Sequence, residues 1–215
     1  MKFLMSLSFL ICCVFSLSAQ KYIDSNDPDE VKSLLSKDNV ITGFGGLDSK
    51  IGYFNEEIGL FSGAFGGVII NRHYLLGMAG YGLVTSNKFT GMVPGFDTPK
   101  ELNIYGGYGG LLIGGIIAPK SMIHLTIPII LGAGNIYISD ENFFNNTIDT
   151  DFTIDQSTFF VIEPGLQIEA NITPVFRISL GATFRMVKGS GLDQPINDDA
   201  LSDLSGLLSF RFGRF

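Results

Sequence analysis

The chain has 215 residues and a net charge of −7, with 16% charged and 46% hydrophobic residues. This acidic balance argues against nucleic acid as a partner, because phosphate binding needs clustered Lys and Arg. After residue 19 no apolar run approaches the roughly 18–20 residues of a membrane helix, so only strands offer this chain a route across a bilayer.

Residues 1–19 are predicted to form a secretory signal. Lys2 supplies the positive charge, an apolar stretch follows, and small residues precede a cleavage site after Ala19. Both cysteines of the chain, Cys12 and Cys13, lie inside this segment. We therefore expect the exported protein to contain no disulfide and no thiol chemistry.

Residues 20–38 are predicted to be a periplasmic segment with a short helix. Pro28 suits the first helical position, and Asp29 and Glu30 place acidic groups in the first turn. We expect this helix to rest at the mouth of the domain that follows, with docking to a partner as the alternative.

Residues 39–215 are predicted to form one all-β domain of eight strands. The expected strands are Asn39–Tyr53, Glu57–Asn71, His73–Ser86, Glu101–Ala118, Ser121–Ser139, Thr158–Asn171, Val175–Val187 and Leu201–Phe215. Tight turns at 71–73, 119–120 and 172–174 alternate with long loops at Asn87–Lys100, Asp140–Ser157 and Lys188–Ala200. Such alternation is typical of an eight-stranded antiparallel up-and-down transmembrane barrel, with both termini on the short-turn, periplasmic side.

The alternation of side chains is clearest in Phe160–Asn171 and Val175–Val187, where one face is apolar and the other is polar and charged. A soluble barrel points its apolar face inward, whereas a barrel in lipid points it outward. The secretory signal and the terminal Phe215 favour the barrel in lipid, with a soluble secreted barrel as the alternative. Glycines dilute the pattern of the first four strands, where we expect them to make room for large inward neighbours.

Three features carry a resemblance to a known family: the ladder of strands and turns, the segment Gly66–Gly77 (GGVIINRHYLLG) and the ending Phe210–Phe215 (FRFGRF). Over residues 39–215 the chain resembles the small eight-stranded outer-membrane barrels related to outer-membrane proteins A and X. The resemblance implies a place in the outer membrane of a Gram-negative bacterium, among its lipids and lipopolysaccharide. The family has no common catalytic residues, so no active site is implied.

The resemblance also implies that the end of the chain is an assembly signal. In the family, a terminal Phe with apolar residues at every second preceding position looks like the signal that the barrel-assembly machinery reads. Phe210, Phe212 and Phe215 are the candidates here. Leu208, Phe210 and Phe212 lie one position out of step with Phe215, and a bulge at Gly213 would restore the phase.

The inward polar faces predict an ion-pair network in the lumen. Its expected members are Glu163, Gln167, Glu169, Arg177, Arg185 and His124. With a three-residue turn at 172–174, Glu169 lies opposite Arg177 and Glu163 lies opposite Thr183 and diagonal to Arg185. Eight strands enclose room only for packed side chains or one small ligand, so we expect a plug, with a proton or ion path as the alternative.

The long loops carry two further features. Asp149, Asp151 and Asp155 lie in a loop without Lys or Arg and form a candidate cation site, although a solvated acidic loop is the expected state. Apolar loop residues either pack over the barrel mouth or form a contact surface, namely Phe89, Met92, Val93, Phe96, Phe143 and Phe144.

The expected function is non-enzymatic, namely a structural or surface-interaction role through the long outer loops. The alternatives are a narrow pore for small solutes and an enzyme that modifies outer-leaflet lipid. Both histidines, His73 and His124, fall near the short-turn end, so a Ser–His or His–Asp site facing the outer leaflet lacks its base. No cofactor and no metal are predicted.

Overall fold

The computed structural model describes residues 39–54, 57–85, 87–91, 99–139, 153–191 and 197–215. The predicted secretory signal and the predicted N-terminal helix lie outside these residues. The candidate cation ligands Asp149 and Asp151 lie outside them as well.

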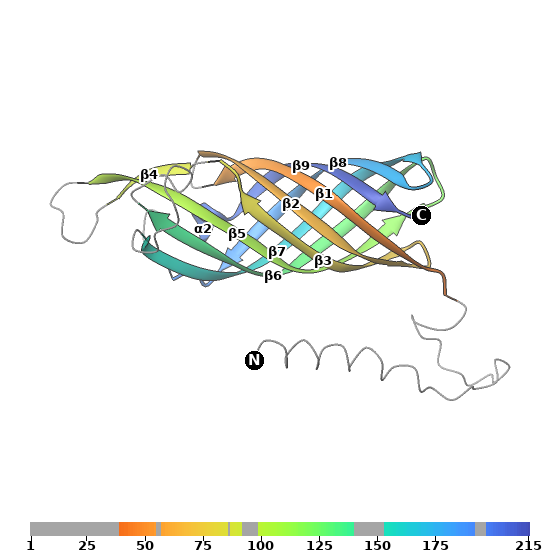
Figure 1. Cartoon of the computed structure of the whole chain (residues 1–215), viewed down its shortest axis with the longest axis horizontal. Coiled ribbons are helices and arrows are strands. Elements are labelled where there is room, and N and C mark those ends of the chain that lie inside the picture. Colours follow the sequence, from red (N-terminus) through yellow and green to blue (C-terminus); the bar gives the residue numbers. More distant parts are fainter. Residues whose placement is uncertain (1–38, 55–56, 86, 92–98, 140–152, 192–196) are drawn as a thin grey trace, which may run out of the picture. The chain divides into compact units, whose positions relative to one another are not determined.

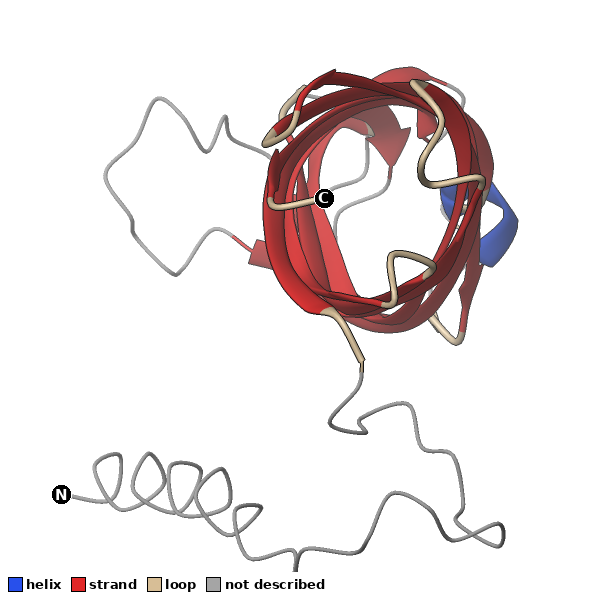
Figure 2. Ribbon diagram, turned by 90° about the vertical axis from the view of Figure 1, so that its right-hand side faces the viewer, coloured by secondary structure: helices blue, strands red, loops and turns tan. Residues whose placement is uncertain are grey.

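The described residues form one antiparallel sheet that closes into a barrel (Figure 1 and Figure 2). Its nine strands are β1 (Ile41–Phe54), β2 (Glu57–Ile70), β3 (Tyr74–Leu83), β4 (Asn87–Gly91), β5 (Lys100–Ile117), β6 (Ile123–Ser139), β7 (Thr153–Thr173), β8 (Phe176–Lys188) and β9 (Asp203–Gly213). Strands that follow one another in the chain are paired in the sheet, except that β3 pairs with β5 instead of with β4, and β1 pairs with β9. Eight strands therefore complete the ring, and the predicted eight-stranded up-and-down barrel is confirmed.

The two ends of the barrel differ. The connections at 71–73, 118–122 and 174–175 are short and lie at the end where Phe215 lies, which we call the turn end. The opposite end, which we call the loop end, carries β4 and the helix α2 (Asp198–Leu201) (Figure 1). Among the described residues no helix is long and apolar enough to span a membrane.

The strands at the loop end are longer than expected. β4 lies within the predicted loop Asn87–Lys100 and pairs with residues 100–104 of β5, so the sheet continues beyond the ring. β7 starts at Thr153, five residues before its predicted start, and α2 lies in the predicted loop Lys188–Ala200. The loop predictions were wrong here because each added pair satisfies backbone hydrogen bonds whether or not its side chains alternate.

The predicted register between β7 and β8 was also wrong, by two residues. β7 runs on to Thr173, with an irregularity after Asn171, so the turn is only Pro174-Val175. Glu169 therefore lies opposite Ser179 instead of Arg177. Thr183 likewise lies opposite Gly165 instead of Glu163. A shift of two residues keeps every side chain on its face, so the inward and outward sets of these strands are as predicted.

Charged side chains lie inside the barrel and apolar ones cover its outside. Leu180 on the outer face of β8 is 64% exposed, whereas Glu169 and Arg185 on the inner faces are 0% and 2% exposed. Part of the interior is apolar, however, because the inward side chains of β2, β3 and β5 are mainly aromatic or aliphatic, including Phe61, Tyr81 and Leu112. The lumen thus has one polar and one apolar wall.

Glycines stand directly across from large inward rings. Gly63 pairs with Tyr81 and Gly134 pairs with Phe159. A Cβ atom at either glycine would collide with the facing ring and with a carbonyl of the neighbouring strand. At Gly63 the structure confirms the expectation for the first four strands that glycine makes room for a large inward neighbour, and Gly134 of β6 does the same.

Candidate functional site

The polar wall of the lumen carries two ionic clusters, and the first is built around Glu169 near the turn end. Its Oε1 lies 2.8 Å from Nη1 of Arg177 and 2.9 Å from Nε2 of His124. Its Oε2 accepts a hydrogen bond of 3.0 Å from the hydroxyl of Ser179. Nη1 of Arg211 lies 2.8 Å from Oε2 but off the N–H direction, so it forms an ion pair without a hydrogen bond. One buried carboxylate thus joins side chains from four strands.

The predicted contacts of this cluster hold although the register differs. Arg177 reaches Glu169 diagonally instead of directly, and His124 on β6 stands directly across from Glu169 on β7. Arg211 was missed by the sequence analysis. The signal for it was present, because outward Phe210 and Phe212 require Arg211 between them to face inward.

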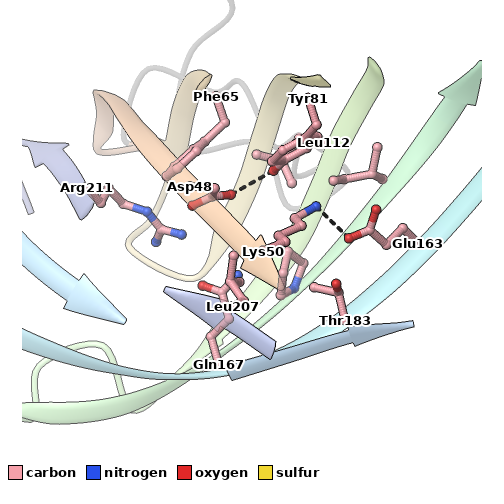
Figure 3. A pocket seen from close by; sticks show the side chains of 12 residues that line it. Asp48, Lys50, Phe65, Tyr81, Leu112, Glu163, Gln167, Thr183, Leu207 and Arg211 are labelled. Atoms are coloured by element: carbon pink, nitrogen blue, oxygen red, sulfur yellow. Dashed lines mark hydrogen bonds and ion pairs between the residues drawn. The ribbon is translucent and has the colours of Figure 1, made fainter. Parts of the chain in front are cut away.

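The second cluster lies further toward the loop end, around Lys50 of β1 (Figure 3). Its Nζ lies 2.5 Å from Oε1 of Glu163, and each side chain is 1% exposed. The same ammonium donates to the Tyr108 hydroxyl at 3.2 Å and lies 3.4 Å from the ring centroid of Tyr81. The Tyr81 hydroxyl in turn donates to Oδ2 of Asp48 at 2.7 Å. The three donor directions of the ammonium are therefore accounted for by a carboxylate, a hydroxyl and an aromatic face.

Asp48 and Lys50 were also missed by the sequence analysis. Their alternation with outward Leu47 and Ile51 was present, but the glycines of β1 diluted the pattern. The prediction paired Glu163 with Arg185, whereas the structure pairs it with Lys50, which is 113 residues away in the chain. Arg185 has other partners.

Arg185 holds the connection between β8 and β9 at the loop end. Its Nε donates to the carbonyl of Leu201 at 2.8 Å, and its Nη2 donates to the carbonyl of Tyr53 at 3.3 Å. The guanidinium lies 4.5 Å from the ring centroid of Phe61. Since Leu201 is fully buried in the hydrophobic cluster of the interior, this contact fastens α2 to the barrel.

A carboxylate orders the start of this connection. Asp198 accepts hydrogen bonds from the backbone N–H groups of Gly189 and Ser190 at 3.0 and 2.9 Å, and from the Ser190 hydroxyl at 2.6 Å. These bonds favour the ionised form and lower the pKa of Asp198 below its ordinary value of 3.8. Asn197 caps the helix by accepting from Ala200 N at 2.8 Å.

Gln167 lies between the two clusters, beside a cavity of about 20 Å³. This volume has room for about one water molecule. Among the described residues no group of three or more His, Cys, Asp or Glu could hold a metal ion. Asp155 of the candidate cation loop lies in β7 opposite Ile138, and its side chain is outside what the structure describes.

The C-terminus closes onto the first cluster. β9 pairs with β8 residue by residue as far as Phe212, and Gly213 N donates to Val175 O at 3.1 Å. The bulge at Gly213 that would bring Phe215 into phase does not form, since β9 pairs with β8 without a register shift and ends at Gly213. The centroid of the Phe215 ring lies 3.7 Å from the Arg177 guanidinium. Phe212 remains on the outer face, 53% exposed. The role of these residues as an assembly signal stays a prediction.

Both histidines lie at the turn end, as predicted. His73 is exposed in the turn after β2, with Nδ1 2.7 Å from the carbonyl oxygen of Asn71. His124 is 3% exposed and bonded to Glu169. Chemically, the polar wall of the lumen pairs buried charges.

Comparison with known proteins gave no matching family model and no match among curated proteins. Solved barrels resemble the chain, among them Neisserial surface protein A (10% identity, 82% of this chain and 99% of that chain, TM-score 0.48) and the N-terminal β-barrel domain of OprF from Pseudomonas aeruginosa (12%, 80% and 96%, 0.44). A third is Ail, the attachment invasion locus protein of Yersinia pestis (13%, 81% and 97%, 0.38). Similarities at this level carry no conclusion about what this chain does.

Proposed function

We propose that this chain is a closed, non-enzymatic β-barrel of a bacterial outer membrane that acts through its outer connections. One observation carries the proposal: the barrel has charges inside and an apolar surface outside. Glu163, Glu169 and Arg185 are at most 2% exposed, whereas apolar side chains such as Ile168 and Leu180 are 58% and 64% exposed. In water this arrangement would leave a large apolar surface wet, while in lipid it is the expected one.

The packing of the lumen supports a barrel that conducts no solute. Along the polar wall, Glu169 contacts Arg177, Arg211 and His124, and Lys50 is enclosed by Glu163 and two aromatic rings. The cavity beside these clusters has room for only about one water. At the turn end, Phe215 stacks on Arg177. At the loop end, Leu201 of α2 is buried in the interior. A hydrated solute would need several of these contacts to break together.

Conductance tests the closed barrel directly. The refolded chain is reconstituted in planar bilayers, after protease shaving of exposed loops has verified insertion. We expect an inserted barrel without steady conductance. A steady current that changes in Glu169→Gln would instead establish a narrow pore with the lumen as its functional site.

Loop deletion tests where the activity lies. The segments 92–98 and 140–152 are shortened separately, and the variants are assayed for heat-modifiable mobility as a sign of folding and for binding to cell surfaces or lipopolysaccharide. We expect folding to persist while surface binding is lost. Loss of barrel assembly in both variants would show that these segments serve the fold, and would contradict an interaction role.

A further inference from the structure

The cavity in the lumen is lined by members of the second cluster and by Arg211 of the first (Figure 3). Its lining combines both walls of the barrel, with Phe65, Leu112 and Ile130 on the apolar side. On the polar side the lining residues are Asp48, Lys50, Glu163, Gln167, Thr183 and Arg211. Charged and apolar groups therefore share one small enclosed space.

Five of these polar residues carry a buried atom without a hydrogen-bond partner. The atoms are Asp48 Oδ1, Glu163 Oε2, Gln167 Oε1, Thr183 Oγ1 and Arg211 Nε. Each residue is at least 95% buried. A buried polar group without a partner costs about 1–3 kcal/mol, so this many in one place call for a ligand that serves several of them.

The unpaired groups approach one another without bonding. The Thr183 hydroxyl is a neighbour of the Glu163 carboxylate but does not reach hydrogen-bond geometry. Asp48 and Lys50 are separated by two positions on β1 and therefore face the same side. A small molecule in the cavity would lie between these side chains of β1 and Glu163 of β7, and could form hydrogen bonds to both strands.

The chemistry of the lining selects the ligand. Two carboxylates, Asp48 and Glu163, are balanced by two cations, Lys50 and Arg211, so an added ion of either sign would meet like charge. The unpaired atoms include both acceptors and a donor, and the Thr183 hydroxyl serves as either. Water both donates and accepts, and a cavity of about 20 Å³ exceeds the roughly 10–15 Å³ that one water requires.

We infer that one water molecule binds in this cavity as a permanent part of the lumen. It accepts a hydrogen bond from the Thr183 hydroxyl and donates its two hydrogens to two of the three unpaired acceptors, which are Asp48 Oδ1, Glu163 Oε2 and Gln167 Oε1. This inference depends only on the interior of the barrel and stands apart from the proposed outer-loop function.

The direct test is detection of this water in the full-length barrel refolded in detergent micelles. Nuclear Overhauser contacts to water are measured at the side-chain amide of Gln167. We expect a long-lived water contact in the native barrel and its loss in Thr183→Val. A native barrel without that contact would overturn the inference.

Stability gives an independent readout through a matched pair of variants. Thr183 and Thr126 are both buried lumen threonines with an unpaired hydroxyl, but only Thr183 lines the cavity. We expect Thr183→Val to lower the folded-to-unfolded ratio in urea roughly tenfold more than Thr126→Val does, and Thr183→Ser to restore it. Equal effects of the two valine variants would contradict a water at Thr183. The stability of the native barrel is also compared in sodium, lithium and choline salts. A dependence on the cation would show that the cavity binds a cation instead of water, and would overturn the inference.

Discussion

At the scale of single residues, the interior of this barrel depends on matching each buried charge. Glu169 is fully buried, and its two oxygens are surrounded by His124, Arg177, Ser179 and Arg211. Desolvation of a carboxylate costs several kcal/mol, and only such a set of partners offsets it. Removing the negative charge of Glu169 therefore leaves the guanidinium groups of both Arg177 and Arg211 without their counter-charge.

Glu169→Gln should destabilise the barrel by about 3–5 kcal/mol, because it leaves buried guanidinium groups without their counter-charge. Urea-driven unfolding in lipid vesicles measures this free energy. The matched control is Glu101→Gln, which removes the same charge from the ion pair between Lys88 and Glu101. That pair is exposed and screened by solvent, so the control should leave the free energy of unfolding nearly unchanged. Similar losses of unfolding free energy in both variants would contradict the prediction that burial makes the Glu169 charge more important than the exposed Glu101 charge.

At the scale of elements, neighbouring strands fit together by pairing glycine with aromatic rings. Tyr81 lies flat across Gly63 and thereby reaches Asp48 on β1. Strand pairing and the ionic cluster are coupled at this point, since the ring that covers glycine also orients the carboxylate.

Gly63→Ala should cost about 1–3 kcal/mol, because its Cβ would press on the Tyr81 ring and on the carbonyl of Gly80. Gly80→Ala is the control on the adjacent strand. A Cβ there meets nothing within 4 Å, so stability should stay the same or rise slightly. Unfolding in urea compares the two, and a larger loss in Gly80→Ala would contradict the close approach at Gly63.

The connection that carries α2 should loosen in acid. The pKa of Asp198 is lowered in the folded barrel by the hydrogen bonds from Ser190 and Gly189, so its stabilising effect is complete above the ordinary pKa of 3.8. The effect is lost as the pH falls through the lowered value. Hydrogen exchange at the Ser190 amide should therefore accelerate below that pH in the native chain. In Asp198→Asn the Ser190 amide should exchange faster already at neutral pH, without an acceleration at low pH. The same acceleration in both proteins would show that another group causes it.

At the scale of the whole molecule, the barrel is arranged for lipid. Its outer face carries apolar side chains around the ring. The buried charged side chains of β7, β8 and β9 lie in the interior, namely Glu163, Glu169, Arg177, Arg185 and Arg211. This arrangement distinguishes a membrane barrel from a soluble one with the same strand count.

Leu180→Arg tests that arrangement. Near the middle of β8, an outward arginine should cost about 2–4 kcal/mol in a bilayer, whereas a soluble barrel would accept it at this exposed position. Thr173→Arg, at the turn end of β7, is the control and should cost about 0–1 kcal/mol. Folding yield and urea midpoints in vesicles measure both, and equal effects would favour a soluble barrel.

Much of this molecule could be predicted from its sequence. The alternation in β7 and β8 placed Glu163, Gln167, Glu169, Arg177 and Arg185 inside, and the structure agrees. In β1 the same rule would have placed Asp48 and Lys50 inside, but four glycines among its fourteen residues weaken the contrast between faces. Glycine has no side chain to mark a face, so the period-2 pattern is lost there.

By itself the sequence determined the class of the fold. In strands with a clear period-2 pattern it also determined which side of the sheet each side chain lies on, because side-chain alternation is a local property of a strand. Only the tertiary structure decided which charges meet. β7 runs on to Thr173 before a two-residue turn and has an irregularity after Asn171, and together these place its register against β8 two residues from the expected one. Closure of the ring brought Lys50 of β1 to Glu163 of β7. Which side chains meet across the lumen depends on the register and curvature of all eight strands together, and the sequence of a single strand does not determine these.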